Sequence, residues 1–208
     1  AADWIRRAMG EEPYRVVWEP LLRGKFGACR EEIALPWFWA RVHFRSTELG
    51  YLRGGFQLLY ERLVERIKAL GGPVRLGTAV TGIARAPAGG VEVHLAGDLE
   101  CFDRVVSTLP TRLTCSLTPE LPQSYRQRYE WGRAYGAHCL ILALDRPLTD
   151  SYWMNVNDPG YPFMALVEHT NYMTPAEYGG RHLVYLGNYR PMDDPLMTRS
   201  QEDVLAEF

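Results

Sequence analysis

The 208-residue sequence lacks the glycine pattern that holds a dinucleotide. Its 19 glycines include four adjacent pairs, yet no two are separated by a single residue, so the G-x-G-x-x-G motif does not occur. In dinucleotide-binding proteins this motif forms a tight turn that lets the N-terminus of a helix approach a pyrophosphate. Its absence excludes a phosphate site of this kind. Lysine is also scarce, with Lys25 and Lys68 set against 21 arginines. The net charge of -2 carries no signature of a nucleic-acid partner.

Motifs for metal binding and for nucleophilic catalysis are missing as well. None of the five histidines has a histidine or cysteine three or four residues away, so we predict no metal site. The G-x-S-x-G elbow, the P-loop and the C-x-x-C pair are absent. No apolar run approaches the roughly 18 residues of a spanning helix, and residues 1–10 do not read as a signal peptide. We therefore expect a cytoplasmic protein with no membrane span.

Four widely spaced cysteines favour buried free thiols over a disulfide, which suits a reducing compartment. The sequence begins without methionine and ends in a helix-like run at residues 204–208. We therefore expect it to be the central piece of a longer protein.

The most regular part of the chain runs from residue 50 to residue 110. Apolar residues at positions 56, 59, 63, 67 and 70 follow the helical period, and Gly71-Gly72-Pro73 ends that helix. Short β-branched segments follow at residues 74–76, 79–86, 91–95, 99–102 and 104–109. The turn at residues 87–90 joins two of them as a hairpin.

Further strands are predicted after residue 110, behind a helix near residues 123–131. They cover residues 138–144, 152–155, 163–169 and 183–188, and the first is apolar on both faces, as in a central strand. Ser200 with Asp203 opens a last helix. Together these elements predict an α+β fold, with a mixed β-sheet, helices on one of its faces and an exposed β-meander.

Residues 34–46 are rich in tryptophan and arginine and fit two structures. Read as a strand, Trp37, Trp39, Arg41 and Arg45 share one face, whereas a helix stacks Trp37, Arg41 and Arg45. We favour a helix, because Pro36 lies near its first turn. These side chains could bind a planar or anionic ligand, or simply belong to a half-buried helix with extended arginines.

The remaining polar candidates are better explained by structure than by catalysis. Residues 168–171, Glu-His-Thr-Asn, follow an apolar strand, where hydrogen-bonded turn residues are more common than a substrate site. His138 is expected in a core and His94 on a wet strand face. No side chain is nominated as a catalytic acid or base.

The block from Gly50 to Pro110 resembles the middle of the flavin-containing amine oxidase superfamily, which includes protoporphyrinogen oxidases and carotenoid desaturases. Six weak motifs occur in the family's order over about 60 residues. The matching residues are Tyr51, Gly54, Gly55 and Leu59, then Thr78, Val80 and Ile83, then Gly90, Val91 and Val93, and finally Asp103, Val105, Val106, Thr108 and Pro110.

The resemblance implies a discontinuous architecture. Residues 1–72 and 111–208 would form a substrate-binding domain, and residues 73–110, with the β-meander, would be the middle segment of an FAD-binding domain. The implied cofactor-binding residues are Val80, Thr108, Pro110, Gly54 and Gly55. The implied substrate-binding residues are Trp37, Trp39, Arg41, Arg45 and Tyr51.

The implied function is that of a substrate-domain fragment of an FAD-dependent oxidoreductase, which transfers hydride from a C–N or C–C bond of a small molecule to flavin. Two alternatives stay open: a flavin-dependent nucleotide-sugar mutase, and a non-catalytic binding or assembly module. Because the pyrophosphate cradle is missing, we expect the fragment to retain no FAD and to be inactive alone. We expect it to pair with the missing FAD-domain segments of its parent chain, or to self-associate through the surface they would cover.

Overall fold

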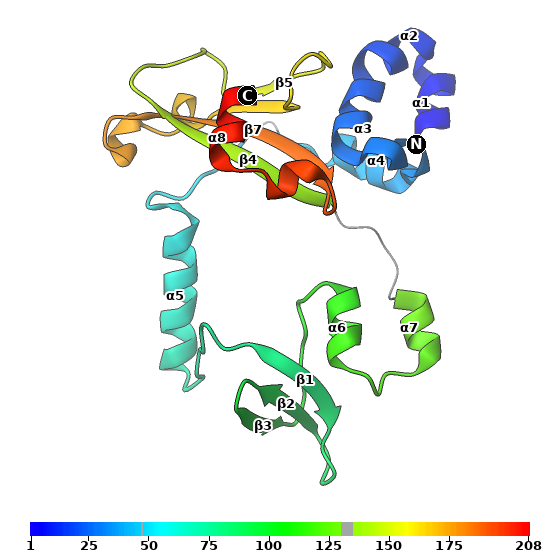
Figure 1. The fold of residues 1–208 in the computed structure, drawn as a ribbon, viewed down its shortest axis with the longest axis vertical. Coiled ribbons are helices and arrows are strands. Elements are labelled where there is room, and N and C mark those ends of the chain that lie inside the picture. Colours follow the sequence, from blue (N-terminus) through cyan, green and yellow to red (C-terminus); the bar gives the residue numbers. More distant parts are fainter. Residues whose placement is uncertain (47, 130–134) are drawn as a thin grey trace. The chain divides into compact units, whose positions relative to one another are not determined.

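The computed structural model describes residues 1–46, 48–129 and 135–208, and its chain divides into two compact units (Figure 1). Unit 1 consists of residues 1–51 and 134–208, and unit 2 of residues 52–133. Both contain helices and an antiparallel sheet, which confirms the α+β class.

The amino-terminal part of unit 1 is helical. Its elements are α1 (Ala2–Met9), α2 (Glu11–Pro13), a π-helical turn (Tyr14–Trp18), α3 (Glu19–Phe26), a 3-10 turn (Gly27–Glu32) and α4 (Leu35–His43). The helical interpretation of residues 34–46 is thereby confirmed. Ile5, Tyr14, Leu22 and Phe38 are buried together, and the Trp18 ring meets the edge of Phe38 at 4.9 Å.

The other part of unit 1 is a four-stranded sheet. Its strands are β4 (Tyr135–Leu144), β5 (Trp153–Asn155), β6 (Ala165–Glu168) and β7 (His182–Pro191). Their order is β4-β7-β6-β5, and every pairing among them is antiparallel.

Two expectations for this sheet need correction. The described pairings form two antiparallel sheets instead of one mixed sheet, and the apolar strand β4 lies at an edge instead of the centre. Parallel neighbours require long crossover connections, whereas these strands reverse through turns and short 3-10 segments.

One face of the four-stranded sheet carries a second hydrophobic core of unit 1. Leu140, Val184 and Leu186 are buried there against Val204 of α8 (Gln201–Glu207), which Figure 1 shows lying over β4 and β7. The predicted cap of α8 is confirmed, because Asp203 N donates to Ser200 Oγ at 3.1 Å.

Glu168, at the end of β6, is fully buried. Its carboxylate accepts the backbone N–H groups of Leu148 at 3.0 Å and Thr149 at 2.6 Å. Each carboxylate oxygen therefore holds one donor of the loop that follows β4. Buried charges are tolerated where hydrogen bonds satisfy them in this way.

Unit 2 contains the predicted amphipathic helix and the meander. Its elements are α5 (Gly55–Ala69), β1 (Val80–Arg85), β2 (Val91–Leu95), β3 (Asp98–Phe102), α6 (Thr111–Leu117) and α7 (Gln123–Tyr129). The strands pair in the order β1-β2-β3, which confirms the meander and the hairpin at residues 87–90. The last two residues of the helix expected at 123–131 lie outside the described residues.

The strands expected at residues 74–76 and 104–109 do not form ladders in the described structure. Both segments are rich in apolar residues, and the side chains of Leu76 and Val106 are 86% and 89% exposed. A β-prone sequence becomes a strand only when another strand accepts its hydrogen bonds, and no described segment does so here. None of the four cysteines forms a disulfide, and only Cys115 is buried, in contrast to the expectation of buried thiols.

The Glu168 contacts predict the effect of a near-isosteric change. In the Glu168→Gln variant one amide N–H₂ group must face a backbone N–H, so a buried donor loses its acceptor. We expect the free energy of unfolding to fall by about 1–3 kcal/mol, measured by urea denaturation. The exposed Glu32, changed in the same way, is the control and should alter stability by less than about 0.5 kcal/mol. Equal effects from both variants would contradict the role given to Glu168.

Candidate functional site

The face of the four-stranded sheet opposite α8 is the candidate site, and we call it the open face. It is formed by the residues that alternate with the core positions. They are Ala137, Cys139, Ile141 and Ala143 of β4, Leu183, Tyr185, Gly187 and Tyr189 of β7, Ala165 and Val167 of β6, and Trp153 and Asn155 of β5. Ile141 is 57% exposed and Trp153 54%, so this face has no complete cover from its own unit.

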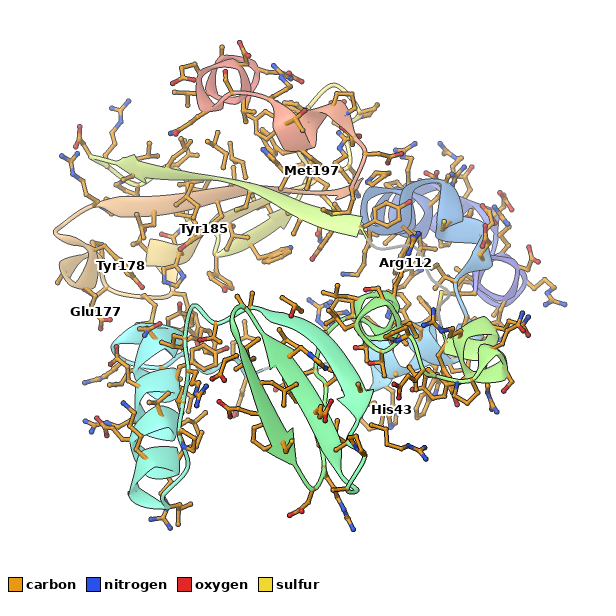
Figure 2. The ribbon with its side chains drawn as sticks, turned by 60° about the horizontal axis from the view of Figure 1, so that its bottom comes forward. His43, Arg112, Glu177, Tyr178, Tyr185 and Met197 are labelled. Atoms are coloured by element: carbon orange, nitrogen blue, oxygen red, sulfur yellow. The ribbon has the colours of Figure 1, made fainter. Side chains whose placement is uncertain are left out.

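An aromatic cluster stands at one end of the open face. The ring of His169, which is only 5% exposed, lies 5.0 Å from Tyr51, 5.3 Å from Tyr178 and 5.8 Å from Tyr185. His169 Nε2 and the Tyr178 hydroxyl are 2.6 Å apart and share a hydrogen bond. Figure 2 shows Tyr178 and Tyr185 on the side of the sheet away from α8.

The groups of this cluster are held in their neutral forms. Burial lowers the pKa of His169, against a smaller opposing effect of the Glu177 carboxylate. Burial also raises the pKa of Tyr178 and that of Tyr185, and Tyr51 adds to both shifts. At neutral pH the cluster therefore offers hydroxyl and imidazole hydrogen bonds without a net charge.

The helical part of unit 1 borders the other end of the open face. The Tyr135 hydroxyl donates to the carbonyl oxygen of Phe26 at 2.7 Å, and Lys25 Nζ lies 4.6 Å from the centre of the Tyr189 ring. These contacts fix α3 beside the sheet. The open face thus lies between α3 and the aromatic cluster.

Of the five substrate-binding residues implied by the sequence, the structure brings Tyr51 to the aromatic cluster. Trp37 instead packs edge-on against Phe26 at 4.9 Å, beside the helical core. Trp39 is 54% exposed and stacks on His43 at 4.4 Å.

The two arginines of that set, Arg41 and Arg45, are exposed. Helix α4 ends at His43, so the expected ridge of Trp37, Arg41 and Arg45 does not continue. The tryptophans and arginines of this segment are therefore not gathered into one patch.

The five implied cofactor-binding residues all lie in unit 2. Gly54 caps α5 in the left-handed region at φ +83°, and Gly55, at φ +75°, has open space within 4 Å of the position that a Cβ atom would take. Val80 opens β1 beside a register irregularity, and Thr108 and Pro110 lie in an exposed segment before α6. Accessible backbone at these positions fits contact with a cofactor, whereas the sequence offers no G-x-G-x-x-G turn for a pyrophosphate.

The hydrogen-bonded turn expected at residues 168–171 is confirmed, because the side chains of all four residues make hydrogen bonds. Besides the Glu168 contacts, Asn171 Nδ2 donates to the Thr149 carbonyl at 2.8 Å, and Thr170 Oγ1 accepts from Leu183 N at 3.1 Å. His138 lies near Phe208 at a ring distance of 5.9 Å, on the α8 side of the sheet, but it is only partly buried and its Nδ1 atom has no hydrogen-bond partner among the described residues.

Sequence reasoning missed the partners that surround His169. Strict alternation along β7 would have placed Tyr185 on the face opposite Val184. The pairing of His169 with Tyr178 joins two 3-10 turns, His169–Asn171 and Pro175–Tyr178, which no periodicity indicates.

Within the described residues, no group of three or more His, Cys, Asp or Glu side chains could hold a metal ion. In the same part of the chain, none of the helices combines the length and apolarity needed to cross a membrane.

Comparison with known proteins assigns the family. Residues 2–206 match the sequence profile of the family described as flavin containing amine oxidoreductase. The chain therefore belongs to that family, as the motifs of residues 50–110 predicted. A search of curated proteins gave no match to this sequence.

Three solved structures share the fold. A "putative protoporphyrinogen oxidase" from Exiguobacterium sp. 255-15 has a TM-score of 0.74 at 18% identity, with 99% of this chain and 49% of that chain covered. An oxidoreductase from Methanosarcina mazei has a TM-score of 0.71 at 18% identity, with 98% and 48% covered. A reduced UDP-galactopyranose mutase has a TM-score of 0.66 at 15% identity, with 99% and 50% covered. The chain thus spans about half the length of each.

The lowered pKa of His169 predicts how stability depends on pH. Because the unfolded chain, with the ordinary value of 6.5, binds the proton more readily than the folded chain, stability is complete above that value. It is lost progressively as the pH falls from about 6.5 toward the lowered pKa. We expect a His169→Gln variant to show a shallower decline over that range in urea denaturation at several pH values. His43→Gln, at an exposed histidine of the same unit, should keep the wild-type slope; if it flattens the curve equally, His169 is not the titrating group.

Proposed function

We propose that this chain forms a wall of the substrate site in an FAD-dependent oxidoreductase that takes hydride from a C–N or C–C bond. The observation that carries the proposal is the open face itself, a largely apolar sheet surface in a chain of the flavin-containing family. Aromatic rings at one end and α3 at the other would limit where a small molecule can lie.

In this proposal residues 1–72 and 111–208 serve the substrate, and residues 73–110 are the middle segment of the FAD-binding part. Val80, Thr108, Pro110, Gly54 and Gly55 would contact the cofactor. Flavin, when bound, supplies the hydride acceptor. Further segments of a parent chain would hold the pyrophosphate, an inference supported by the half-length coverage of the similar structures.

The chain's own part in the reaction would be binding, orientation and exclusion of water. Tyr178 and Tyr185 bring neutral hydroxyl groups to one end of the open face, and His169 shares a hydrogen bond with that of Tyr178. No proton transfer is assigned to these residues. Orientation of a bound molecule toward a cofactor can by itself supply much of a rate enhancement.

A nucleotide-sugar mutase is the second candidate, favoured by the similarity to a reduced UDP-galactopyranose mutase. A diphosphate calls for arginine side chains that converge on it. Arg41 and Arg45 lie on or just after α4 and are not on the strands of the open face. The oxidoreductase is therefore the better-supported proposal, ahead of both the mutase and a non-catalytic binding module.

Flavin content tests the proposal directly. We expect the protein purified from its full reading frame to show the visible absorbance of oxidised flavin, and the 208-residue chain purified alone to lack it. Anaerobic addition of an oxidisable substrate should then bleach the full-length protein. A full-length protein without flavin would refute the oxidoreductase and the mutase alike, whereas turnover of a nucleotide sugar without net oxidation would select the mutase.

Exposed apolar residues in unit 2 predict self-association of the 208-residue chain. Leu76 and Val106 are almost fully exposed, and surfaces of this kind are usually covered. We expect concentration-dependent association in sedimentation velocity, reduced in the double variant Leu76→Glu, Val106→Glu. Leu205→Glu, at the half-exposed Leu205 of α8, is the control and should associate like the wild type. A wild-type chain that stays monomeric at high concentration contradicts the prediction.

A further inference from the structure

A small pocket lies on the covered side of the four-stranded sheet, where the end of β7 meets the segment that leads into α8. Its volume is about 210 Å³, and all of its lining residues belong to unit 1. We call it the α8 pocket. The residues that give it its chemistry are Arg190, Asp194, Leu196, Arg199, Glu207 and Phe208.

The size of the α8 pocket limits what it can hold. Pockets that enclose larger organic ligands usually measure about 300–1,000 Å³. The α8 pocket is smaller than this range, and it opens on the face of the sheet opposite the proposed substrate surface. It therefore suits a ligand of a few heavy atoms that is distinct from the substrate.

Arg190 brings a positive charge to the pocket without a counter-charge. Its side chain is partly buried, and its Nε atom is buried with no hydrogen-bond partner among the described residues. In the same part of the chain, no ion pair joins its guanidinium to a carboxylate. A guanidinium stays protonated at any pH at which the protein is folded, and an unpaired buried charge is costly. The pocket thus lacks one anionic partner.

The other charged groups of the pocket are already engaged. Asp194 Oδ1 accepts the backbone N–H of Leu196 at 2.9 Å and so caps the 3-10 turn Pro195–Thr198. Arg199 forms an ion pair with Glu207. Arg190 is therefore the group left to bind an anion. The carboxylates of Asp194 and Glu207 in the same lining would repel a ligand with more than one negative charge.

Packing holds the walls of the pocket in place. Arg190 lies opposite Gly136 of β4, and a Cβ atom at Gly136 would collide with the Met197 side chain. Figure 2 shows Met197 on the side of the sheet that carries α8. The buried Asn188 side chain donates to the carbonyl oxygen of Pro162, another lining residue. A ligand would thus enter a preformed site and pay little to order it.

We propose that the α8 pocket binds one small organic monocarboxylate. Its carboxylate pairs with the Arg190 guanidinium, whose planar fork of N–H donors matches two carboxylate oxygens. Its short apolar end lies against Leu196 and Phe208, which supply apolar lining. The bound ligand joins β7 to the segment around α8 and stabilises the folded chain by mass action. This site is independent of the proposed oxidoreductase function.

The test compares a carboxylate with its uncharged analogue. Propionate and propionamide have nearly the same shape, and each is titrated by calorimetry into the protein purified from its full reading frame, at constant ionic strength. Inorganic phosphate is the second anion. Arg190→Met removes an unpaired charge and keeps a long unbranched side chain, so it should fold as stably as the wild type. Arg146→Met, at an exposed arginine of the loop after β4, is the matched control.

We expect one propionate to bind per chain, phosphate to bind more weakly and propionamide not to bind. Arg190→Met should weaken propionate binding by about tenfold or more, which corresponds to about 1.4 kcal/mol, and Arg146→Met should leave it unchanged. The assignment is overturned by a lack of propionate binding, by equal binding of propionamide, by tighter binding of phosphate, or by unchanged affinity of Arg190→Met.

A second measurement keeps the test decisive if Arg190→Met misfolds. Phenylglyoxal modifies arginine side chains, and its reaction with the wild-type protein is followed residue by residue with mass spectrometry. Propionate should slow modification of Arg190 severalfold, with the exposed Arg146 as the internal reference. Equal rates at Arg190 with and without propionate would place the carboxylate elsewhere and refute the proposal.

Discussion

The ladder between β4 and β7 is the constraint on which the rest of unit 1 depends. It pairs all ten residues of β4, from Tyr135 opposite Pro191 to Leu144 opposite His182. Since side chains alternate between the faces of a strand, this register alone decides which residues meet α8. A slip by one residue would turn Asn188 and Arg190 onto the open face and lift Val184 and Leu186 out of the core.

The position of the buried Glu168 carboxylate also depends on strand register. β6 follows β7 in the sheet, and its register opposite Val184 sends Glu168 to the covered side, where it anchors the loop after β4. The charged side chains of these strands, Glu168 and Arg190, thus both lie on the face that holds the core, where backbone N–H groups bind the Glu168 carboxylate. The consequence is that the strands themselves place no charged side chain on the open face, although Lys25 of α3 lies over Tyr189 at its border.

Much of this fold could be predicted from the sequence, because several segments carry their own periodicity. The helix of residues 55–69 follows from its apolar spacing, and the meander follows from β-branched segments around the Gly89-Gly90 turn. The strands expected at residues 74–76 and 104–109 were wrong for the described structure, since a strand depends on a partner that can be distant in sequence. Strand order likewise cannot be predicted from local sequence patterns. The apolar residues on both faces of β4 therefore suggested a central strand, although β4 lies at an edge.

The candidate site was less accessible to sequence reasoning. Tyr51 was singled out by its family motif, and Tyr185 could have been found from alternation along β7. His169 and Tyr178 come together through two irregular turns, and contacts of that kind depend on tertiary structure alone. The tryptophans of α4 drew attention by their composition, yet one side of that helix faces its own core and the other faces solvent.

The small residues of the open face have a consequence for how such a protein can change over time. Gly187 has no side chain at all, and Cys139 and Asn155 point away from the buried cluster that stabilises unit 1. Substitutions at these positions alter the open face without removing contacts from that cluster. If the open face binds the substrate as proposed, binding preference and folding stability would be encoded on opposite faces of the same four strands, and a lineage could exchange one ligand for another while its architecture stays intact.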